Sequence, residues 1–360
     1  MKKIALRLIG AVLLIATVLA CFSGCSGISR KAAIRYGDQE ISRGLFQYLC
    51  CMEKTSYLYE LYGVDSESVQ ASQLEDNPAF WTAVASDGMS AGDTLKMEVL
   101  EQLQVNLFLA NYAVEQGYTL GVEQKKAIQA EFDKMVKQFQ SKALFEKQMK
   151  QYGVDYDELL KYNYFQNLAW KGNDLLFGEE GTMKISEDSI QKYFNKNYIT
   201  VGSIFINTKN KTYPNGKVVV LPAAEKEAKI QLAQEVFNRA KAGEDFAALS
   251  LEYSDSKTMS EKISKSGYTF EKGGFENSEA EAKAFEMAEG DVIRVEVSGG
   301  YYILKRMPLN SGYFSDVKDV ISEKLTNTKK FSLLLDYMDQ FKMDEDFLNQ
   351  LDISVLPHVV

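Results

Sequence analysis

Residues 198–206 read Tyr-Ile-Thr-Val-Gly-Ser-Ile-Phe-Ile, and here the spacing of apolar side chains changes from that of a helix to that of a strand. Short runs that are rich in β-branched residues favour strands. This stretch opens a segment of roughly 197–308, which holds one clear helix at 222–242 and a last strand at 301–304. The sequence therefore predicts an α/β module in the middle of the chain.

Helical patterns lie on both sides of this module. Before it we expect a turn at Gly37-Asp38 and a helix at 43–62 that Ser42 caps. Further helices are expected from Asp93 or Thr94 to 117, at 121–152 and at 156–177, followed by a short one that Ser186 caps. A loop at 65–92, with a short helix around Phe80-Trp81, separates the first two long helices. After the module we expect a helix at 314–341 and a closing strand at 353–355.

This order of elements predicts the fold class α+β. The N- and C-terminal segments, 34–196 and 309–360, are expected to form one mainly helical lobe. The α/β module, 197–308, would be inserted in it as a small antiparallel sheet with helices. Such insertions occur because the two ends of a domain often lie close together.

The first residues have the pattern of a secretory signal peptide. Three basic residues among the first seven precede an apolar run at 8–20, which ends in small residues. The run is shorter than the roughly 20 residues that a membrane-spanning helix needs. Export from the cytoplasm is therefore expected.

The end of this leader, Phe22-Ser23-Gly24-Cys25, resembles the lipobox of bacterial lipoproteins. The resemblance implies a signal peptide at 1–24, lipidation of Cys25, and a tether at 25–33. Cys21 is a second candidate for lipidation, and an ordinary thiol after a plain cleaved signal is the alternative. Because two or more acyl chains anchor stably, we expect a protein held on the extracytoplasmic face of the cell membrane.

Composition narrows the classes of function. The chain has 360 residues, of which 46% are hydrophobic and 25% charged, and a net charge of −9. An acidic chain without a basic stripe argues against nucleic acid as a partner. The one histidine, His358, lies near the end of the chain, where a solvated tail residue is expected. No histidine-based catalytic triad or multi-histidine metal site can therefore form, and we expect neither a metal nor a cofactor.

Two adjacent cysteines, Cys50 and Cys51, lie in an apolar stretch of the first long helix. We interpret them as two buried thiols, with a vicinal disulfide as the alternative. Export would permit disulfides, but this pair alone cannot hold the fold together.

The middle segment resembles a parvulin-type peptidyl-prolyl isomerase domain in five stretches that follow the order of that family. They are TVGSIFI at 200–206, AKAGEDFAALS at 240–250, EYSDS at 252–256, AFEMAEGDV at 284–292 and GGYYILK at 299–305. The flanks are similar to the SurA/PrsA foldases, at YGDQEISR (36–43), LEQL (100–103) and EQGYTL (115–120). The resemblance implies an extracytoplasmic foldase in which a helical chaperone lobe carries an inserted parvulin domain.

In parvulins two histidines on neighbouring strands, with a Cys or Asp nearby, form the polar floor of the site. The resemblance places Ser203 and Tyr302 at the histidine positions and Ser256 at the Cys/Asp position. These three hydroxyls are the candidate catalytic residues. They are expected to form a weakened isomerase site, or else Ser203 and Tyr302 merely satisfy each other in a fold retained for binding.

Apolar residues at the expected proline site are the candidate substrate-binding residues: Phe270, Phe275, Phe285 and Met287. The Met and Phe that line the proline pocket in the family align near Glu276 and Ala280. Rotation about a prolyl bond crosses a barrier of about 18–20 kcal/mol and needs neither a nucleophile nor a metal. An apolar pocket and polar groups that favour the twisted amide suffice.

Three functions remain open from the sequence. The first is a foldase that binds unfolded or partly folded exported polypeptides and assists prolyl isomerisation, anchored to the membrane, with its oligomeric state open and a dimer as one option. The second is a catalytically inactive holdase or scaffold lipoprotein of the same architecture. The third is a solute-binding lipoprotein, which the long helical N-terminal region disfavours.

Overall fold

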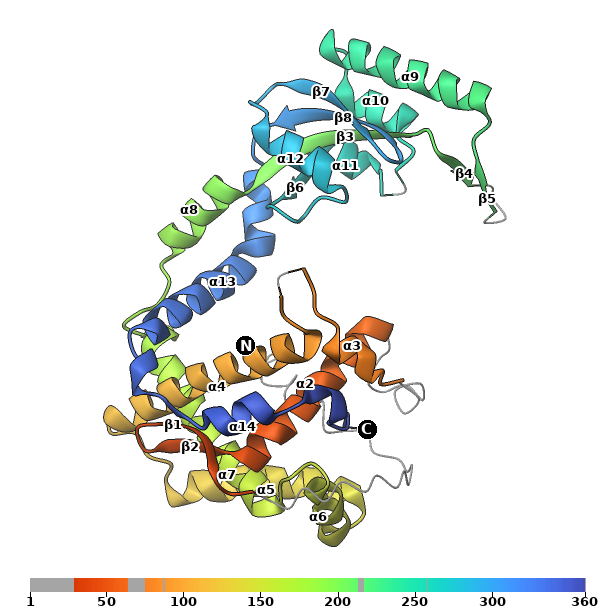
Figure 1. Ribbon diagram of the computed structural model, residues 1–360. Helices are drawn as coiled ribbons and strands as arrows, with labels where there is room; N and C mark the ends of the chain where they lie inside the picture. The colour runs from red at the N-terminus through yellow and green to blue at the C-terminus, as the bar shows by residue number, and fades with distance from the viewer. Residues whose placement is uncertain (1–28, 64–74, 87, 213–216, 257, 360) are drawn as a thin grey trace. The chain divides into compact units, whose positions relative to one another are not determined.

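The computed structural model describes residues 29–63, 75–86, 88–212, 217–256 and 258–359 (Figure 1). The leader, with Cys21 and Cys25, lies outside these residues. The chain divides into two compact units, of which the second is Ile185–Leu325 and the first takes the residues on both sides of it. The fold is α+β, as predicted, with helices and small antiparallel sheets. None of the helices in the described ranges has the length and apolar character that crossing a membrane requires.

The first unit is mainly helical. Its N-terminal elements are β1 Ala32–Tyr36, β2 Gln39–Ser42, α2 Arg43–Tyr62, α3 Pro78–Thr82, α4 Ala91–Glu115, α5 Val122–Val136, η2 Lys137–Phe139, α6 Lys142–Lys150 and α7 Tyr156–Phe177. Its C-terminal elements are the end of α13 Phe314–Leu335, η4 Met338–Gln340, β9 Lys342–Met343, α14 Glu345–Gln350 and η5 Ile353–Val355. β9 pairs with β1 in a sheet of order β2-β1-β9, so the two ends of the chain form one lobe.

Local signals explain where these elements begin and end. Gly37 has a φ of 55° in the turn between β1 and β2, as the turn prediction requires. The Ser42 hydroxyl accepts a hydrogen bond from the Leu45 amide at 3.0 Å and caps α2, which confirms that prediction. Gly63, with a φ of 60°, ends the helix in the left-handed conformation.

Three predictions for the first unit were wrong. Ser90, rather than Asp93 or Thr94, caps α4, because its hydroxyl accepts from the Asp93 amide at 3.1 Å. The helix expected at 121–152 is broken into α5, η2 and α6, since Gln140 adopts a φ of 66° after the buried Phe139. Residues 353–355 form the 3₁₀ turn η5 rather than a strand, and the closing strand is β9.

The core of the first unit depends on close contact between α4 and α7. A Cβ at Gly172 of α7 would lie 1.9 Å from the carbonyl oxygen of Leu109 in α4, so only glycine permits this approach. Cys50 and Cys51 are fully buried in the same core and form no disulfide. Burial raises the pKa of Cys51 to about 12, so that the group stays a thiol rather than a reactive thiolate. The interpretation as buried structural thiols is confirmed.

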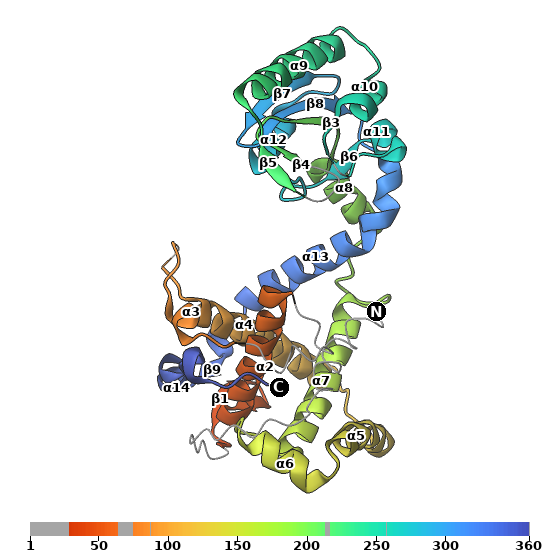
Figure 2. The same ribbon diagram turned by 90° about the vertical axis from the view of Figure 1, so that its right-hand side faces the viewer.

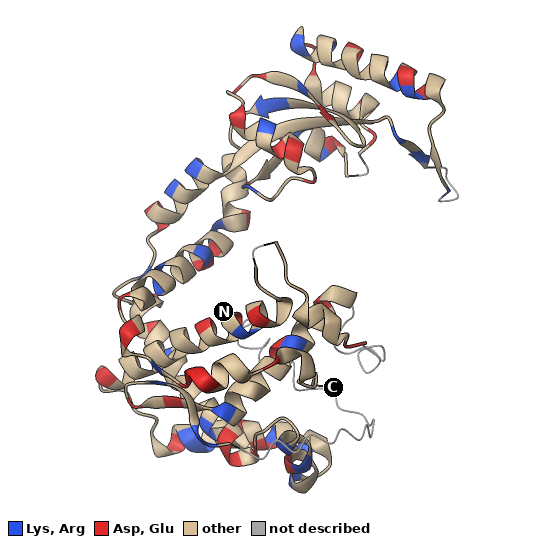
Figure 3. Cartoon of the chain, viewed as in Figure 1, with Lys and Arg blue, Asp and Glu red and all other residues tan. Residues whose placement is uncertain are grey.

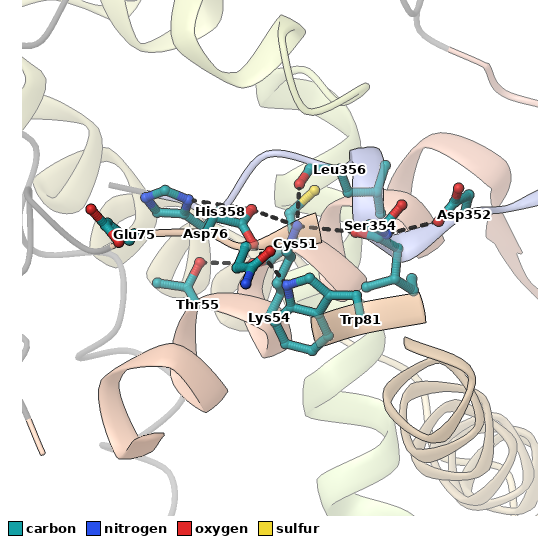
Figure 4. A network of polar contacts seen from close by, with 12 residues as sticks. Cys51, Lys54, Thr55, Glu75, Asp76, Trp81, Asp352, Ser354, Leu356 and His358 are labelled. Atoms are coloured by element: carbon teal, nitrogen blue, oxygen red, sulfur yellow. Dashed lines mark hydrogen bonds and ion pairs between the residues drawn. The ribbon is translucent and has the colours of Figure 1, made fainter. Parts of the chain in front are cut away.

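Lys54 of α2 is fully buried and joins the C-terminal segment to the first helix (Figure 4). Its Nζ lies 2.6 Å from Oδ2 of Asp76 and donates to the carbonyl oxygens of Ile353 and Leu356 at 3.0 and 2.7 Å. A buried ammonium is tolerated only when it is paired and hydrogen-bonded in this way.

His358 also belongs to this network, which corrects the expectation of a solvated tail residue. Its side chain is only 20% exposed, and its Nδ1 lies 3.8 Å from Oδ2 of Asp76. The indole of Trp81 donates to the other oxygen of Asp76 at 2.7 Å. Burial alone would raise the pKa of Asp76, but the nearby His358 and the close contacts with Lys54 and Trp81 outweigh it and lower the pKa below its ordinary value.

The second unit is an antiparallel sheet between helices. Its elements are α8 Glu187–Asn197, β3 Ile199–Asn207, β4 Asn210–Thr212, β5 Val218–Val220, α9 Ala223–Lys241, α10 Phe246–Tyr253, α11 Glu261–Ser266, β6 Tyr268–Phe270, α12 Ser278–Glu286, β7 Val292–Val297, β8 Gly300–Met307, η3 Ser311–Tyr313 and the start of α13. The main sheet has the order β6-β3-β8-β7. Ser186 caps α8, as predicted. The sequence predicted only α9 among the four helices between β3 and β7.

Alternation along β3 decides which helices cover which face of the sheet (Figures 1 and 2). Ile204 and Ile206 pack with α9 and α10, whereas Val201 packs with α12 on the opposite face. A third cluster joins Phe194 of α8 to Ile321 of α13. The second unit, Ile185–Leu325, therefore extends beyond the segment 197–308 at both its N-terminal and its C-terminal end.

Candidate substrate-binding site

The register of the central strands places Ser203 and Tyr302 on one face of the sheet, but not directly opposite each other. Ser203 pairs with Leu304, and Phe205 pairs with Tyr302. Side chains of paired residues share a face, so Ser203 and Tyr302 are diagonal neighbours. No hydrogen bond joins the two hydroxyls in the residues that the structure describes. The alternative in which the hydroxyls of Ser203 and Tyr302 satisfy each other was therefore wrong.

Tyr302 has a different partner, Glu276. The phenol donates to Oε1 of Glu276 at 2.8 Å, and the side chain of Tyr302 is 5% exposed. Burial, followed by the nearby Glu276 carboxylate, raises the pKa of Tyr302 above its ordinary value. The phenol therefore remains protonated and acts as a hydrogen-bond donor at neutral pH. Sequence reasoning placed Glu276 near the proline pocket but not as this acceptor.

Ser256 belongs to a separate chain of hydroxyls. Its Oγ lies 3.0 Å from Oγ1 of Thr258, which in turn lies 2.8 Å from the phenol of Tyr268. The preceding Asp255 accepts from the Asn207 amide at 2.9 Å and thereby holds this segment against the end of β3. The three candidate catalytic hydroxyls are thus not one network in the described part of the chain.

The four candidate substrate-binding residues do come together. Phe270, Phe275, Phe285 and Met287 belong to one apolar cluster with Tyr302. The ring of Phe275 lies 5.1 Å from that of Phe270 and 5.6 Å from that of Tyr302. Phe275 and Phe285 are only partly buried, so aromatic surface remains accessible beside the Tyr302 and Glu276 pair.

A carboxylate that the sequence did not point to, Glu281 of α12, holds the loop that carries Phe275. It accepts from the amides of Gly273 and Phe275 at 2.8 and 2.9 Å. These amides have no strand partner, because the loop lies between β6 and α12. An acidic residue in the first turn of a helix was the only signal in the sequence, and such residues are common.

The other end of this loop is fixed by Glu271. Its carboxylate accepts from the phenol of Tyr193 and from Nζ of Lys324, each at 2.9 Å. Burial would raise the pKa of Glu271, but these hydrogen bonds outweigh it and lower the pKa. The loop is therefore held at both ends, with Phe275 set into the aromatic cluster between them.

Residues 204–308 match the family model of the rotamase, or PPIC-type PPIase, domain. The second unit contains a PPIC-type PPIase domain. The match covers β3 from Ile204 to the end of β8 and therefore includes Tyr302, Ser256 and the whole aromatic cluster. Ser203 lies one residue before it.

Known structures are similar to the chain over most of its length at low identity. PrsA from Bacillus subtilis shares 19% identity, with 76% of this chain and 92% of that chain covered and a TM-score of 0.24. PrsA from Bacillus cereus shares 17%, with 77% and 93% covered and a TM-score of 0.32. A SurA-like chaperone of Campylobacter jejuni shares 18%, with 75% and 97% covered and a TM-score of 0.23. No curated protein matches the chain.

The arrangement in the PPIC-type domain suits contact with a proline ring or another apolar side chain. Aromatic faces and a sulfur atom provide the apolar surface, and Tyr302 provides a hydrogen-bond donor at its edge. Isomerisation also needs polar groups directed together at the twisted amide. In the described residues no hydrogen bond joins the hydroxyls of Ser203, Ser256 and Tyr302 to one another, so they do not form such a group.

Proposed function

We propose that the protein is an extracytoplasmic chaperone that binds unfolded or partly folded exported polypeptides, and that its PPIC-type domain binds without accelerating prolyl isomerisation. The observation that carries this proposal is the aromatic cluster around Phe275, which is partly accessible, beside a site whose three hydroxyls form no common network. The family match supports a site for proline-containing chain. The lone histidine, His358, lies outside that match and cannot supply the family's polar floor.

Isomerisation is the second candidate function. The match of residues 204–308 to the rotamase family favours it, as does the Tyr302 phenol, which could donate a hydrogen bond to a substrate. The solute-binding alternative finds no support, since it needs two doubly wound lobes and the described main sheet is antiparallel.

The location is part of the same proposal. The leader and the lipobox at 22–25 support export and a lipid anchor on Cys25, with the body of the chain outside the cytoplasm. A membrane-bound chaperone at this face would meet polypeptides as they emerge in an unfolded state.

Suppression of aggregation tests the binding function. We expect the full chain, at equimolar amounts, to prevent light scattering by a chemically denatured reporter protein after dilution from denaturant. The variant Phe275→Ala should weaken this effect, because it removes the partly exposed ring at the centre of the cluster, whereas Tyr164→Ala, a change at a partly exposed aromatic residue in the first unit, serves as the control. Scattering that is identical with and without the full chain would contradict the proposal.

A further inference from the structure

The hairpin of β4 and β5 forms a two-stranded sheet that is separate from the main sheet of its unit. Asn210 pairs with Val220, Lys211 with Val219, and Thr212 with Val218. The three valines of β5 are 58%, 37% and 72% exposed, in chain order. Three exposed valines in one strand do not contribute to a hydrophobic core. The neighbouring backbone groups and charges of the hairpin indicate what the strand could bind.

The outer edge of β5 has unpaired backbone groups in the described part of the chain. The Leu221 amide donates to the Lys209 carbonyl at 2.9 Å, which makes these two residues a hydrogen-bonded pair. In an antiparallel ladder such pairs alternate, so Lys211 and Val219 form the next one. The amides and carbonyls of Val218 and Val220 therefore point away from β4. An edge of this kind is a template for another strand.

The charged residues along the described part of the hairpin are lysines (Figure 3), and the register of the two strands gives its two faces different chemistry. Because side chains alternate along a strand, Val218 and Val220 lie on one face. Val219 lies on the other face, together with its partner Lys211 and with Lys209, the partner of Leu221. No acidic residue occurs between 207 and 221, although the chain as a whole has a net charge of −9.

A strand added beside β5 would meet both faces in turn. Its residues on the valine face would contact apolar side chains, and those on the lysine face would meet positive charge. Cross-strand neighbours of like chemistry or opposite charge stabilise a sheet. The partner that fits is an extended chain in which acidic and apolar residues alternate.

We propose that the free edge of β5 binds an extended polypeptide segment in which acidic residues alternate with β-branched apolar residues. This inference rests on the proposed polypeptide-binding function and adds the class of segment that is bound. A second copy of the chain fits less well, because pairing of two β5 edges would bring the lysine faces of both hairpins together. A flat anionic membrane fits less well, because valines and lysines lie on opposite faces.

A fluorescent peptide in which Glu and Val alternate is the probe, and its anisotropy reports binding to the full chain. Val218→Pro and Val220→Pro each remove an outward amide without touching the ladder to β4, and we expect each to weaken binding roughly tenfold. Val122→Pro is the matched control, since Val122 is an exposed valine at the first position of α5, where proline is tolerated. Circular dichroism of each variant checks that it folds.

Two further experiments distinguish the contribution of backbone hydrogen bonds from that of the lysine charges. A peptide N-methylated at alternate residues cannot pair with the edge, and we expect it not to bind. The double change Lys209→Glu and Lys211→Glu should weaken binding of the alternating peptide, whereas Lys241→Glu with Lys262→Glu, exposed lysines of the same unit, should not.

Equal binding of the normal and N-methylated peptides, or equal binding by the hairpin and control variants, would overturn the assignment. The assignment would also be overturned if the peptide does not bind and the hairpin variants instead lose binding to phosphatidylglycerol vesicles. Loss of self-association in these variants, again without peptide binding, would overturn it in the same way. An unfolded acidic protein, carboxymethylated α-lactalbumin, separates the two proposals. If the full chain and the Val220→Pro variant bind it equally, the edge assignment fails and the chaperone function stands; if the full chain does not bind it, both fail.

Discussion

Replacement of Asp76 by alanine is expected to lower the free energy of unfolding of the first unit by about 3 kcal/mol. The change leaves the ammonium of Lys54, which is 0% exposed, without its carboxylate at 2.6 Å. It also removes the acceptor of the Trp81 indole. Urea unfolding followed by Trp fluorescence, with a second probe such as circular dichroism, measures the loss.

The control is Glu75→Ala, which removes an exposed carboxylate one residue away and should change stability by less than about 0.5 kcal/mol. The double change Lys54→Met with Asp76→Asn removes both charges and should recover part of the loss, because no unpaired ion remains. If Asp76→Ala and Glu75→Ala are equally stable, Lys54 does not depend on this carboxylate.

The ion pair of Lys54 and Asp76 also makes the stability of the first unit depend on pH in a known direction. The pKa of Asp76 is lowered on folding from its ordinary value of 3.8, so its contribution is fully present above that value. It is lost as the pH falls through the lowered pKa, where the carboxylate takes up a proton. The difference in stability between the wild type and Asp76→Ala should therefore shrink as the solution is acidified below pH 3.8.

Replacement of Glu281 by alanine is expected to destabilise the second unit by about 2 kcal/mol and to release the loop that carries Phe275. Glu281 accepts two amide hydrogen bonds, at 2.8 and 2.9 Å. A hydrogen bond to a charged group contributes about 1.5–3 kcal/mol, and the total loss is smaller than the sum of two because water can reach the exposed Gly273 amide. Hydrogen exchange should show faster exchange at the amides of Gly273 and Phe275. Denaturant unfolding measures the loss of stability.

Glu279→Ala is a matched control for this change. Glu279 is an exposed acid in the same first turn of α12, so both variants lose the same favourable interaction with the helix dipole. In the described residues Glu281 accepts hydrogen bonds from the loop, and Glu279 accepts none. Unchanged exchange at Gly273 and Phe275 in Glu281→Ala would show that the loop is held by other contacts.

Local patterns allowed much of the fold to be predicted. The alternation that begins at Ile199 gave the central strand, and the hydroxyls of Ser42 and Ser186 gave the starts of two helices. These features depend on residues close in sequence. The helices α10, α11 and α12 were missed because each has nine residues or fewer, which is too short for a clear helical period.

The candidate site depends on register, which the sequence did not specify. β3 and β8 are far apart in the chain, so no turn fixes their pairing, and Tyr302 lies opposite Phe205 rather than Ser203. At Gly300, a Cβ would lie 2.0 Å from the carbonyl oxygen of Ile206, and this close approach helps to fix the register. The hydrogen bond that Tyr302 donates to Glu276 joins residues 26 apart in the chain and depends on that packing. The place of His358 in the Asp76 network is likewise a contact between distant segments.

Proline-limited refolding tests most directly whether the PPIC-type domain binds polypeptide without catalysing prolyl isomerisation. With the full chain at catalytic amounts, we predict that the slow refolding phase of a reporter protein keeps its uncatalysed rate, and that equimolar amounts slow it by holding the non-native chain. A rate that rises in proportion to catalytic amounts of the chain, and falls back in Tyr302→Phe, would contradict the claim and establish an isomerase.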